Sequence, residues 1–309
     1  MPSLKIIRKR ISSTKATQKI TRAMKMVAGA RLTRAQQRIL AMRPYAVKTA
    51  EVLQSVTRTM AAATDSQNEP VHPLLARRPE QKALFLVFSS DRGLCGALNT
   101  NINKSVERAW REKEASGVQV SFATLGRKGR EYLNRRRADA VRDFPRIYDG
   151  LGIEKARLVA TWLVRRFEKG ECDAVYFAYN EFKSALTQRV VIERLLPLGE
   201  PGNGAAGGSP ARASEDAAQR IAPSDFIFEP NQLALLERLV PMYVEISVYR
   251  SLLDSQASFF GAQMTAMDAA TRNAKDMIAR YTLMYNRARQ AAITKELMEI
   301  IGGAEALKT

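Results

Sequence analysis

Apolar and small residues recur at alternating steps of three and four along the first sixty residues of the chain. The repeat averages about 3.5 residues, which is typical of a helix that packs along one seam against another helix. The pattern therefore predicts one long N-terminal helix, which would reach ~85 Å if unbroken and which we expect Pro44 to kink. Many seam positions hold alanine, threonine or glutamine, so the two helices should approach closely with moderate stability. The series comprises Leu4, Ile7, Ile11, Thr14, Gln18, Thr21, Met24, Ala28, Leu32, Ala35, Ile39, Met42, Ala46, Thr49, Leu53, Val56 and Met60.

The same spacing returns near the C-terminus and predicts a second long helix. Turns between Leu233 and Ile246 extend this helix upstream, with a local bend expected at Pro241. Two such stripes bury their apolar faces either by pairing within one chain or by dimerising. We favour antiparallel pairing within one chain, because the intervening residues have the pattern of a compact domain that brings the two ends together. The second series comprises Phe260, Met264, Met267, Thr271, Ala274, Ile278, Tyr281, Tyr285, Ala288 and Ala292.

Between the two helical segments, short apolar runs alternate with helical patterns, which predicts a small, mainly parallel α/β sheet. The candidate strands are residues 83–88, 118–124 and 174–178, with 185–196 as a further candidate. The candidate helices are residues 99–113, 127–137 and 153–168. Residues 199–223 are rich in Gly, Ala, Ser and Pro and lack apolar periodicity, so we expect a flexible loop there.

The chain carries a formal net charge of +18, and the excess lies in the first helix. Residues 1–60 hold fourteen Lys and Arg against one carboxylate, whereas residues 231–309 hold nine basic residues against eight acidic ones. The unremarkable interpretation is a solvated outer face of a coiled coil. Tyr45 is the only aromatic residue before Met60, which disfavours nucleic-acid binding, and the seam lacks the large apolar residues of a membrane-surface helix. An acidic protein partner fits best.

The loop at residues 89–96 follows a candidate strand and precedes a candidate helix, where nucleotide-binding folds place their phosphate loops. The chain has neither G-x-x-x-x-G-K-[ST] nor G-x-G-x-x-G, and the GRKG run at 126–129 is too short. We therefore expect no nucleotide cofactor. An enzyme built on the central domain remains only as a rival interpretation.

Other candidate chemistry is sparse. His72 is the only histidine, and we expect it to lie in a surface loop rather than in a metal or nucleophile site. Cys95 and Cys172 lie far apart, which suggests neither a disulfide nor a zinc site, and Cys95 should fill a tight turn as a small apolar residue. Glu296 and Glu299 have the spacing of a solvated helix face. We expect no catalytic residue and no metal site.

No apolar run approaches the ~18 residues that span a bilayer, and the basic start of the chain leads into no apolar region. We expect a chain that neither spans a membrane nor is secreted, in a reducing cytoplasmic setting.

Three motifs resemble the signatures of one family, in the same order. They are TQKITRAMKMVA at 17–28, SDRGLCG at 90–96 and YNRARQAAITKEL at 285–297. On these residues the chain resembles the gamma subunits of F-type ATP synthases over nearly its whole length, apart from residues 199–223, which look like an insertion.

The resemblance implies an α/β fold with a long antiparallel coiled coil, in which the N- and C-terminal helices pair into a rod beside a central Rossmann-like domain. The implied division is residues 1–60 for the N-terminal helix, 61–82 for a linker, 83–198 for the α/β domain, 199–223 for a flexible insertion and 224–309 for the C-terminal helix.

The resemblance also implies a role as a non-catalytic rotor shaft of the F1 sector of a proton-translocating ATP synthase. Such a rod turns within a ring of three alpha and three beta subunits, and its foot, with the epsilon subunit, is fixed to the c-subunit ring. A place on the cytoplasmic face of a bacterial inner membrane follows, with indirect membrane association. A basic coiled-coil protein that binds nucleic acid is the alternative.

By position in the motifs, Met24, Arg289, Gln290 and Thr294 resemble family residues that contact the beta subunits. Ile293, Leu297, Ile300 and Ile301 make the last turns apolar, which suits either a tip seated in an apolar bearing or an end packed on its own chain. We expect Gly302 and Gly303 to end this helix. One stretch departs from the family pattern: residues 258–264 are SFFGAQM where Ser-Glu-x-x-Ala-Arg-Met is expected, so a charged contact is missing at Phe259 and Gln263.

Overall fold

The computed structural model describes residues 3–63, 72–76, 78–138, 140–198 and 232–306. The chain divides into two units by its internal contacts. The first unit is Met1–Ala30 with Gln263–Thr309, and the second is Arg31–Ala262. Among the described residues, no helix is both long and apolar enough to cross a bilayer. The expected insertion at 199–223 lies outside the described residues.

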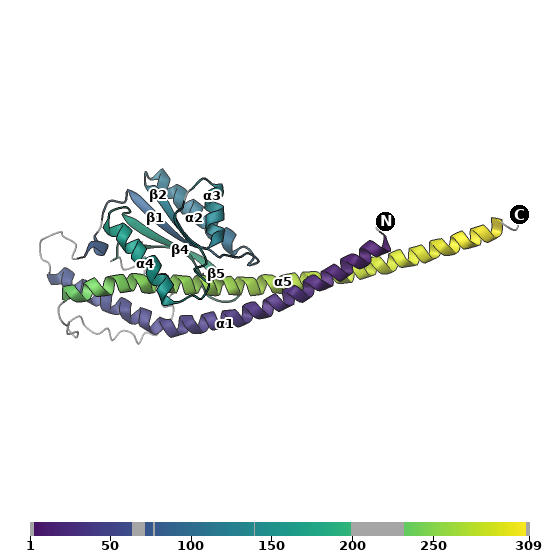
Figure 1. Cartoon of the computed structure of the whole chain (residues 1–309), viewed down its shortest axis with the longest axis horizontal. Helices are drawn as coiled ribbons and strands as arrows, with labels where there is room; N and C mark the ends of the chain where they lie inside the picture. Colours follow the sequence, from purple (N-terminus) through teal and green to yellow (C-terminus); the bar gives the residue numbers. More distant parts are fainter. Residues whose placement is uncertain (1–2, 64–71, 77, 139, 199–231, 307–309) are drawn as a thin grey trace. The chain divides into compact units, whose positions relative to one another are not determined.

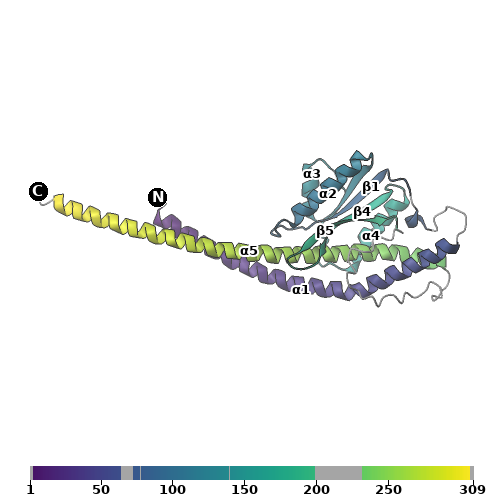
Figure 2. The ribbon, with the colours of Figure 1, turned by 180° about the vertical axis from the view of Figure 1, so that it is seen from behind.

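Two long helices, α1 (Leu4–Ala63) and α5 (Gln232–Ala306), contribute a segment to each unit. In the first unit the segments run side by side (Figure 1 and Figure 2). The Thr271 hydroxyl donates to the Thr21 hydroxyl at 2.8 Å, and the Lys25 ammonium pairs with Asp268. Because the partner numbers rise on α5 as they fall on α1, the pairing is antiparallel and within one chain, as the sequence predicts.

The predicted stripes form the least exposed face of each helix. In α1, Ile7, Ala28 and Leu53 are buried, and every other described stripe position is buried or half-buried. The small residues allow a close approach: a Cβ added at Gly29 would lie 3.4 Å from the Met264 sulfur. The period in the sequence thus identified the packed face correctly.

Both helices pass through residues that were expected to bend or stop them. The helical assignment is continuous through Pro44 in α1 and Pro241 in α5. It also continues through Gly302 and Gly303 to Ala306, so the predicted end of the helix is wrong. Glycine costs only about 1 kcal/mol per residue in a helix interior, so two glycines are a weak stop signal.

The second unit contains a five-stranded sheet of order β3-β2-β1-β4-β5, in which only β5 is antiparallel to its neighbour. The predicted mainly parallel sheet is confirmed. Its strands are β1 (Lys82–Phe88), β2 (Gln119–Leu125), β3 (Ala140–Phe144), β4 (Ala174–Phe182) and β5 (Gln188–Leu196). Its helices are α2 (Leu98–Ala115), α3 (Arg127–Arg135) and α4 (Ile153–Glu168), with the short η1 (Pro73–Leu75).

Strand β1 is buried on both faces, as its continuous apolar run predicts. Its alternate residues Ala83, Phe85 and Val87 pack with residues of α2 and α3. Leu84, Leu86 and Phe88 belong to a larger core that includes residues of α4, η1 and α5. Figure 1 shows α2 and α3 on one face of the sheet and α4 on the other. Two helical layers therefore sandwich the sheet.

Strand β3 was not predicted, because its five residues, AVRDF, carry two charges and lie at the edge of the sheet, where most of them are partly or fully exposed.

The expected surface position of His72 is wrong. His72 is 7 % exposed and precedes η1, where its Nδ1 accepts a hydrogen bond from the Leu74 amide at 3.1 Å. Leu74 is fully buried in the core, so it draws the adjoining histidine inward. Burial lowers the pKa of His72.

Candidate functional site

The first unit presents a basic surface on its α1 segment. Seven lysines and arginines between Lys5 and Arg22 are exposed, and among the described residues none of these seven forms an ion pair. Lys25, next along the helix, pairs with Asp268, and this contact lowers the pKa of the Asp268 carboxyl. The unpaired cations attract an acidic surface at long range.

The last turns of α5 have no partner helix within the first unit. Leu4 lies seventeen residues before Thr21, and Ala288 lies seventeen residues after Thr271, so the register of that pair places the start of α1 opposite Ala288. Helix α5 continues to Ala306, and Figure 1 shows it extending past the start of α1.

Beyond this point the apolar side chains face solvent: Ile293 is 47 %, Leu297 53 %, Ile300 67 % and Ile301 60 % exposed. The described side chains therefore do not pack this end on the chain itself. Contiguous exposed apolar side chains of this kind are typical of a surface that another protein covers.

The four residues expected to contact partner subunits fall in two places. Met24 is half-buried on the seam, whereas Arg289, Gln290 and Thr294 are exposed on α5. The Thr294 hydroxyl donates to the Gln290 carbonyl oxygen at 2.9 Å, one turn away. Since Lys25 pairs with Asp268, Met24 lies opposite residue 269, twenty residues or ~30 Å from Arg289. The chain thus offers two separate candidate contact positions.

The loop after β1 caps helix α3 instead of leaving its amides free for a phosphate group. The first three amides of α3 are all occupied: Arg127 donates to the Asp91 carboxylate at 3.1 Å, Lys128 to the Ser90 carbonyl oxygen at 3.0 Å and Gly129 to the Ser89 hydroxyl at 2.7 Å. A helix N-terminus binds anions through such amides only when they are unpaired. The amides at the start of α3, in the GRKG run, are therefore not free to bind a phosphate group.

The two cysteines have no feature of a nucleophile. Both are buried, and burial raises the pKa of the Cys95 thiol and raises that of Cys172 to about 11. Cys95 lies in the turn before α2, as expected for a small apolar residue. No group of three or more potential metal ligands occurs among the described residues.

Buried carboxylates lie on the α5 side of the sheet in the second unit. Asp254 of α5 is 7 % exposed, and the nearest cation, the Arg250 Nε, is 3.9 Å from its Oδ2. Glu193 of β5 and Glu181 of β4 also act on it, and Lys183 pairs with Glu181 at 2.8 Å. Burial raises the pKa of both Asp254 and Glu193 to about 7.

Comparison with known proteins decides the family. A family model described as ATP synthase matches residues 3–307. The chain is 54 % identical to the ATP synthase gamma chain of Sorangium cellulosum strain So ce56, over the full length of both chains. It is 46 % identical to the ATP synthase gamma chain of Anaeromyxobacter sp. strain Fw109-5, again over the full length of both. The chain belongs to the gamma-chain family of ATP synthases.

Solved structures agree on the fold of this gamma chain. The central stalk and c-ring structure of the Tetrahymena thermophila mitochondrial ATP synthase holds a chain with a TM-score of 0.60 at 24 % identity, covering 81 % of this chain and 99 % of that one. A chain of the Euglena gracilis mitochondrial ATP synthase in rotational state 3 gives 0.63 at 19 % identity, covering 98 % and 94 %. At these identities the likeness concerns the fold alone.

A gamma chain is a non-catalytic subunit, so the membership accounts for the absence of a motif for chemistry in the sequence. The comparisons give no support to the nucleic-acid alternative.

Two features of this gamma chain were not predicted from the sequence: the buried carboxylates, and a cavity lined by Arg31, Arg34 and Arg38. The buried carboxylates give no periodic signal in the sequence. The three arginines stand at i, i+3 and i+7 and so share one helix face, and this spacing is a signal that the sequence does contain.

Proposed function

We propose that this gamma chain is the central rotor shaft of the F1 sector of an ATP synthase, coupling rotation of a c-subunit ring to the cycling of catalytic sites on beta subunits. The observation that carries the proposal is the full-length similarity to gamma chains, joined to a helical pair whose last turns are unpaired and apolar. A rod of two helices transmits torque because its backbone hydrogen bonds and seam contacts lie along its whole length.

The proposed contacts with beta subunits are Met24, Arg289, Gln290 and Thr294. Arg289 is exposed, and a guanidinium forms bidentate hydrogen bonds with a carboxylate. The unpaired cations of α1 guide the same acidic partner at longer range. Small and polar side chains on the seam keep the rod slender enough to turn.

The proposed bearing is the exposed apolar end, with Ile293, Leu297, Ile300 and Ile301 seated in a sleeve formed by the alpha and beta subunits. Apolar contacts are non-directional, so they hold the tip without fixing its angle of rotation. An ion-paired tip would resist turning, because each bond would have to break at every step.

We further propose three alpha and three beta subunits, an epsilon subunit and a c-subunit ring as partners. In this proposal residues 1–60 and 224–309 form the shaft, residues 83–198 form the foot, and residues 61–82 and 199–223 connect them. Membrane association is indirect, on the cytoplasmic face of a bacterial inner membrane.

Reconstitution tests the proposal. The chain is mixed with purified alpha and beta subunits, and a bead is attached through a cysteine introduced as Leu186→Cys, at a position 81 % exposed in the β4–β5 turn. The native cysteines are both buried, so labelling is specific. We expect unidirectional, ATP-driven rotation. Failure of the chain to assemble with alpha and beta subunits would contradict the proposal.

A further inference from the structure

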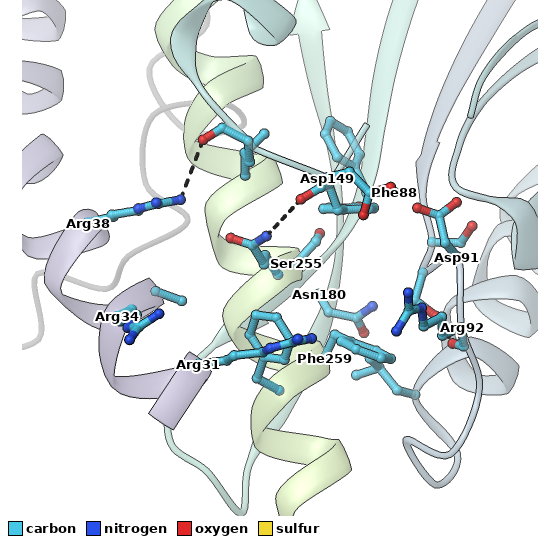
Figure 3. Close-up of a pocket in the computed structure, with 18 of the residues that line it drawn as sticks. Arg31, Arg34, Arg38, Phe88, Asp91, Arg92, Asp149, Asn180, Ser255 and Phe259 are labelled. Carbon is cyan, nitrogen blue, oxygen red and sulfur yellow. Dashed lines mark hydrogen bonds between the residues drawn. The ribbon is translucent and has the colours of Figure 1, made fainter. Parts of the chain in front are cut away.

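The second unit contains a cavity of about 430 Å³ whose described lining residues all belong to that unit. Helices α1 and α5, the loop after β1, the loop after β3 and strand β4 all contribute to its wall. Figure 3 shows Arg31 and Arg34 on one side, Asp91 and Arg92 on the other, and Asn180 between them. Its volume lies in the range of small-molecule sites in proteins.

The cavity lies at the topological switch point of the sheet. Strand β1 pairs with β2 on one side and with β4 on the other, so the strand order reverses between β1 and β4. Phe88 at the carboxyl end of β1 and Asn180 near the carboxyl end of β4 both line the cavity. In open α/β sheets, ligands bind in the crevice at this place.

The wall carries an excess of positive charge. Four arginines line it against two carboxylates, Asp91 and Asp149. Among the described residues, none of the four arginines forms an ion pair, although the Arg38 Nη1 donates to the Leu151 carbonyl oxygen at 3.4 Å. Guanidinium groups without carboxylate partners are the side chains that bind phosphate bidentately.

Two buried hydroxyl groups lie together in the same wall. Ser255 of α5 is only 5 % exposed, and its side chain is the hydrogen-bonding neighbour of the buried Tyr148 hydroxyl; neither oxygen has a further partner among the described residues. A hydrogen bond between two hydroxyls uses only one of their two protons, so the other can be donated to a polar group that enters the cavity.

An aromatic surface completes the site. Phe259 and Phe260 line the cavity with ring centroids 5.5 Å apart, and the Arg31 guanidinium lies 5.9 Å from the Phe260 ring centroid. A flat ring in the ligand would stack on such a surface.

We propose that this cavity binds a small anion with two or more phosphate groups, in which Arg34 and Arg92 pair with the phosphates and Ser255 donates to a phosphate oxygen. A nucleotide and an inorganic polyphosphate share this chemistry. Phe259 distinguishes them, since only a nucleotide has a base to place against its ring.

Isothermal titration calorimetry of the full-length chain with ATP, ADP and inorganic tripolyphosphate tests the proposal. At ~0.15 M salt, where surface charges are screened beyond ~8 Å, we expect one saturable site per chain. The double variant Arg34→Gln/Arg92→Gln should weaken binding about a hundredfold, since each charge-assisted pair contributes roughly tenfold. Ser255→Ala should cause a smaller loss.

The matched control is Arg43→Gln, an exposed arginine of the same helix that does not line the cavity. Fluorescence of Trp110 and Trp162 verifies that each variant is folded. If Phe259→Ala weakens the binding of ATP but not that of tripolyphosphate, the ligand is a nucleotide. If Phe259→Ala leaves the binding of both probes unchanged, the ligand is an inorganic polyphosphate. Absence of saturable binding of all three probes up to ~1 mM, or unchanged binding by the double arginine variant, overturns the proposal.

Discussion

Replacing Asp254 with asparagine should stabilise the second unit at alkaline pH and leave it nearly unchanged at acid pH. Asp254 is buried on α5, and the Arg250 Nε lies 3.9 Å from its Oδ2; Lys183 also acts on Asp254 but pairs with Glu181. Loss of hydration is therefore the main influence on this carboxyl group, and it raises the pKa to about 7 in the folded chain. Asparagine has nearly the same shape and carries no charge that burial would penalise.

The raised pKa determines both the sign and the size of the effect. Between the ordinary pKa of 3.8 and the folded value of about 7, the folded chain binds more protons than the unfolded chain. The free energy of unfolding therefore falls as the pH rises through this window and becomes constant above it. Three pKa units correspond to roughly 4 kcal/mol, of which roughly 2.5 kcal/mol falls between pH 5 and 8. Glu193, whose pKa is also raised to about 7, adds to this slope in the unmodified chain and in the variant.

Urea unfolding followed by tryptophan fluorescence measures this effect in the relevant unit, because the two tryptophans, Trp110 and Trp162, both lie in the α/β domain. The difference in free energy of unfolding between Asp254→Asn and the unmodified chain should grow with pH by roughly 2.5 kcal/mol from pH 5 to 8. Asp276→Asn, at an exposed position of the same helix, is the control and should show no such growth. A constant difference for Asp254→Asn across this range would refute the reasoning.

Three further predictions concern single positions. Gly126→Ala should lower the free energy of unfolding, measured in urea, by about 2–4 kcal/mol. Gly126 has φ +96°, and an added Cβ would lie 2.2 Å from the Ser89 carbonyl oxygen. An unchanged urea midpoint would contradict this prediction. Leu163→Ala, at a fully buried position of α4, should cost about 2–5 kcal/mol, whereas Leu158→Ala, 54 % exposed on the same helix, should change stability by less than ~0.5 kcal/mol. Arg289→Ala should leave the unfolding midpoint unchanged but reduce assembly or torque in the reconstituted complex, with Arg280→Ala as the control; loss of fold in Arg289→Ala would argue against a contact role.

The helical pair was predictable because its pattern is long and regular. A stripe repeated over many turns specifies both the helix and the face that packs, so the sequence predicts Ala28, Leu32 and Ala35 as seam residues, and all three are buried. The central strands were predictable for a related reason: β1 is buried on both faces and so is apolar at nearly every position.

What could not be predicted depends on contacts between residues distant in sequence. Edge strand β3 has no apolar pattern of its own, and its pairing with β2 defines it. His72 is buried because Leu74, two residues further on, packs in the core. No local sequence pattern predicts that contact. Gly302 and Gly303 show the opposite limit: a local stop signal of about 1 kcal/mol per glycine did not end a helix of 75 residues.

The two kinds of candidate site differ in the same way. The candidate contact residues on the two long helices could be predicted from the sequence, because each lies in a motif or on a periodic face within a single helix. The arginine-lined cavity was not, because Arg34 belongs to α1, Arg92 to the loop after β1 and Ser255 to α5, and only the fold gathers them. A sequence shows that three arginines share a helix face, but not that Ser255 and the Tyr148 hydroxyl lie together in the same cavity wall. In this chain, therefore, the proposed partner surfaces follow from local sequence patterns, whereas the proposed small-molecule site depends on the tertiary structure.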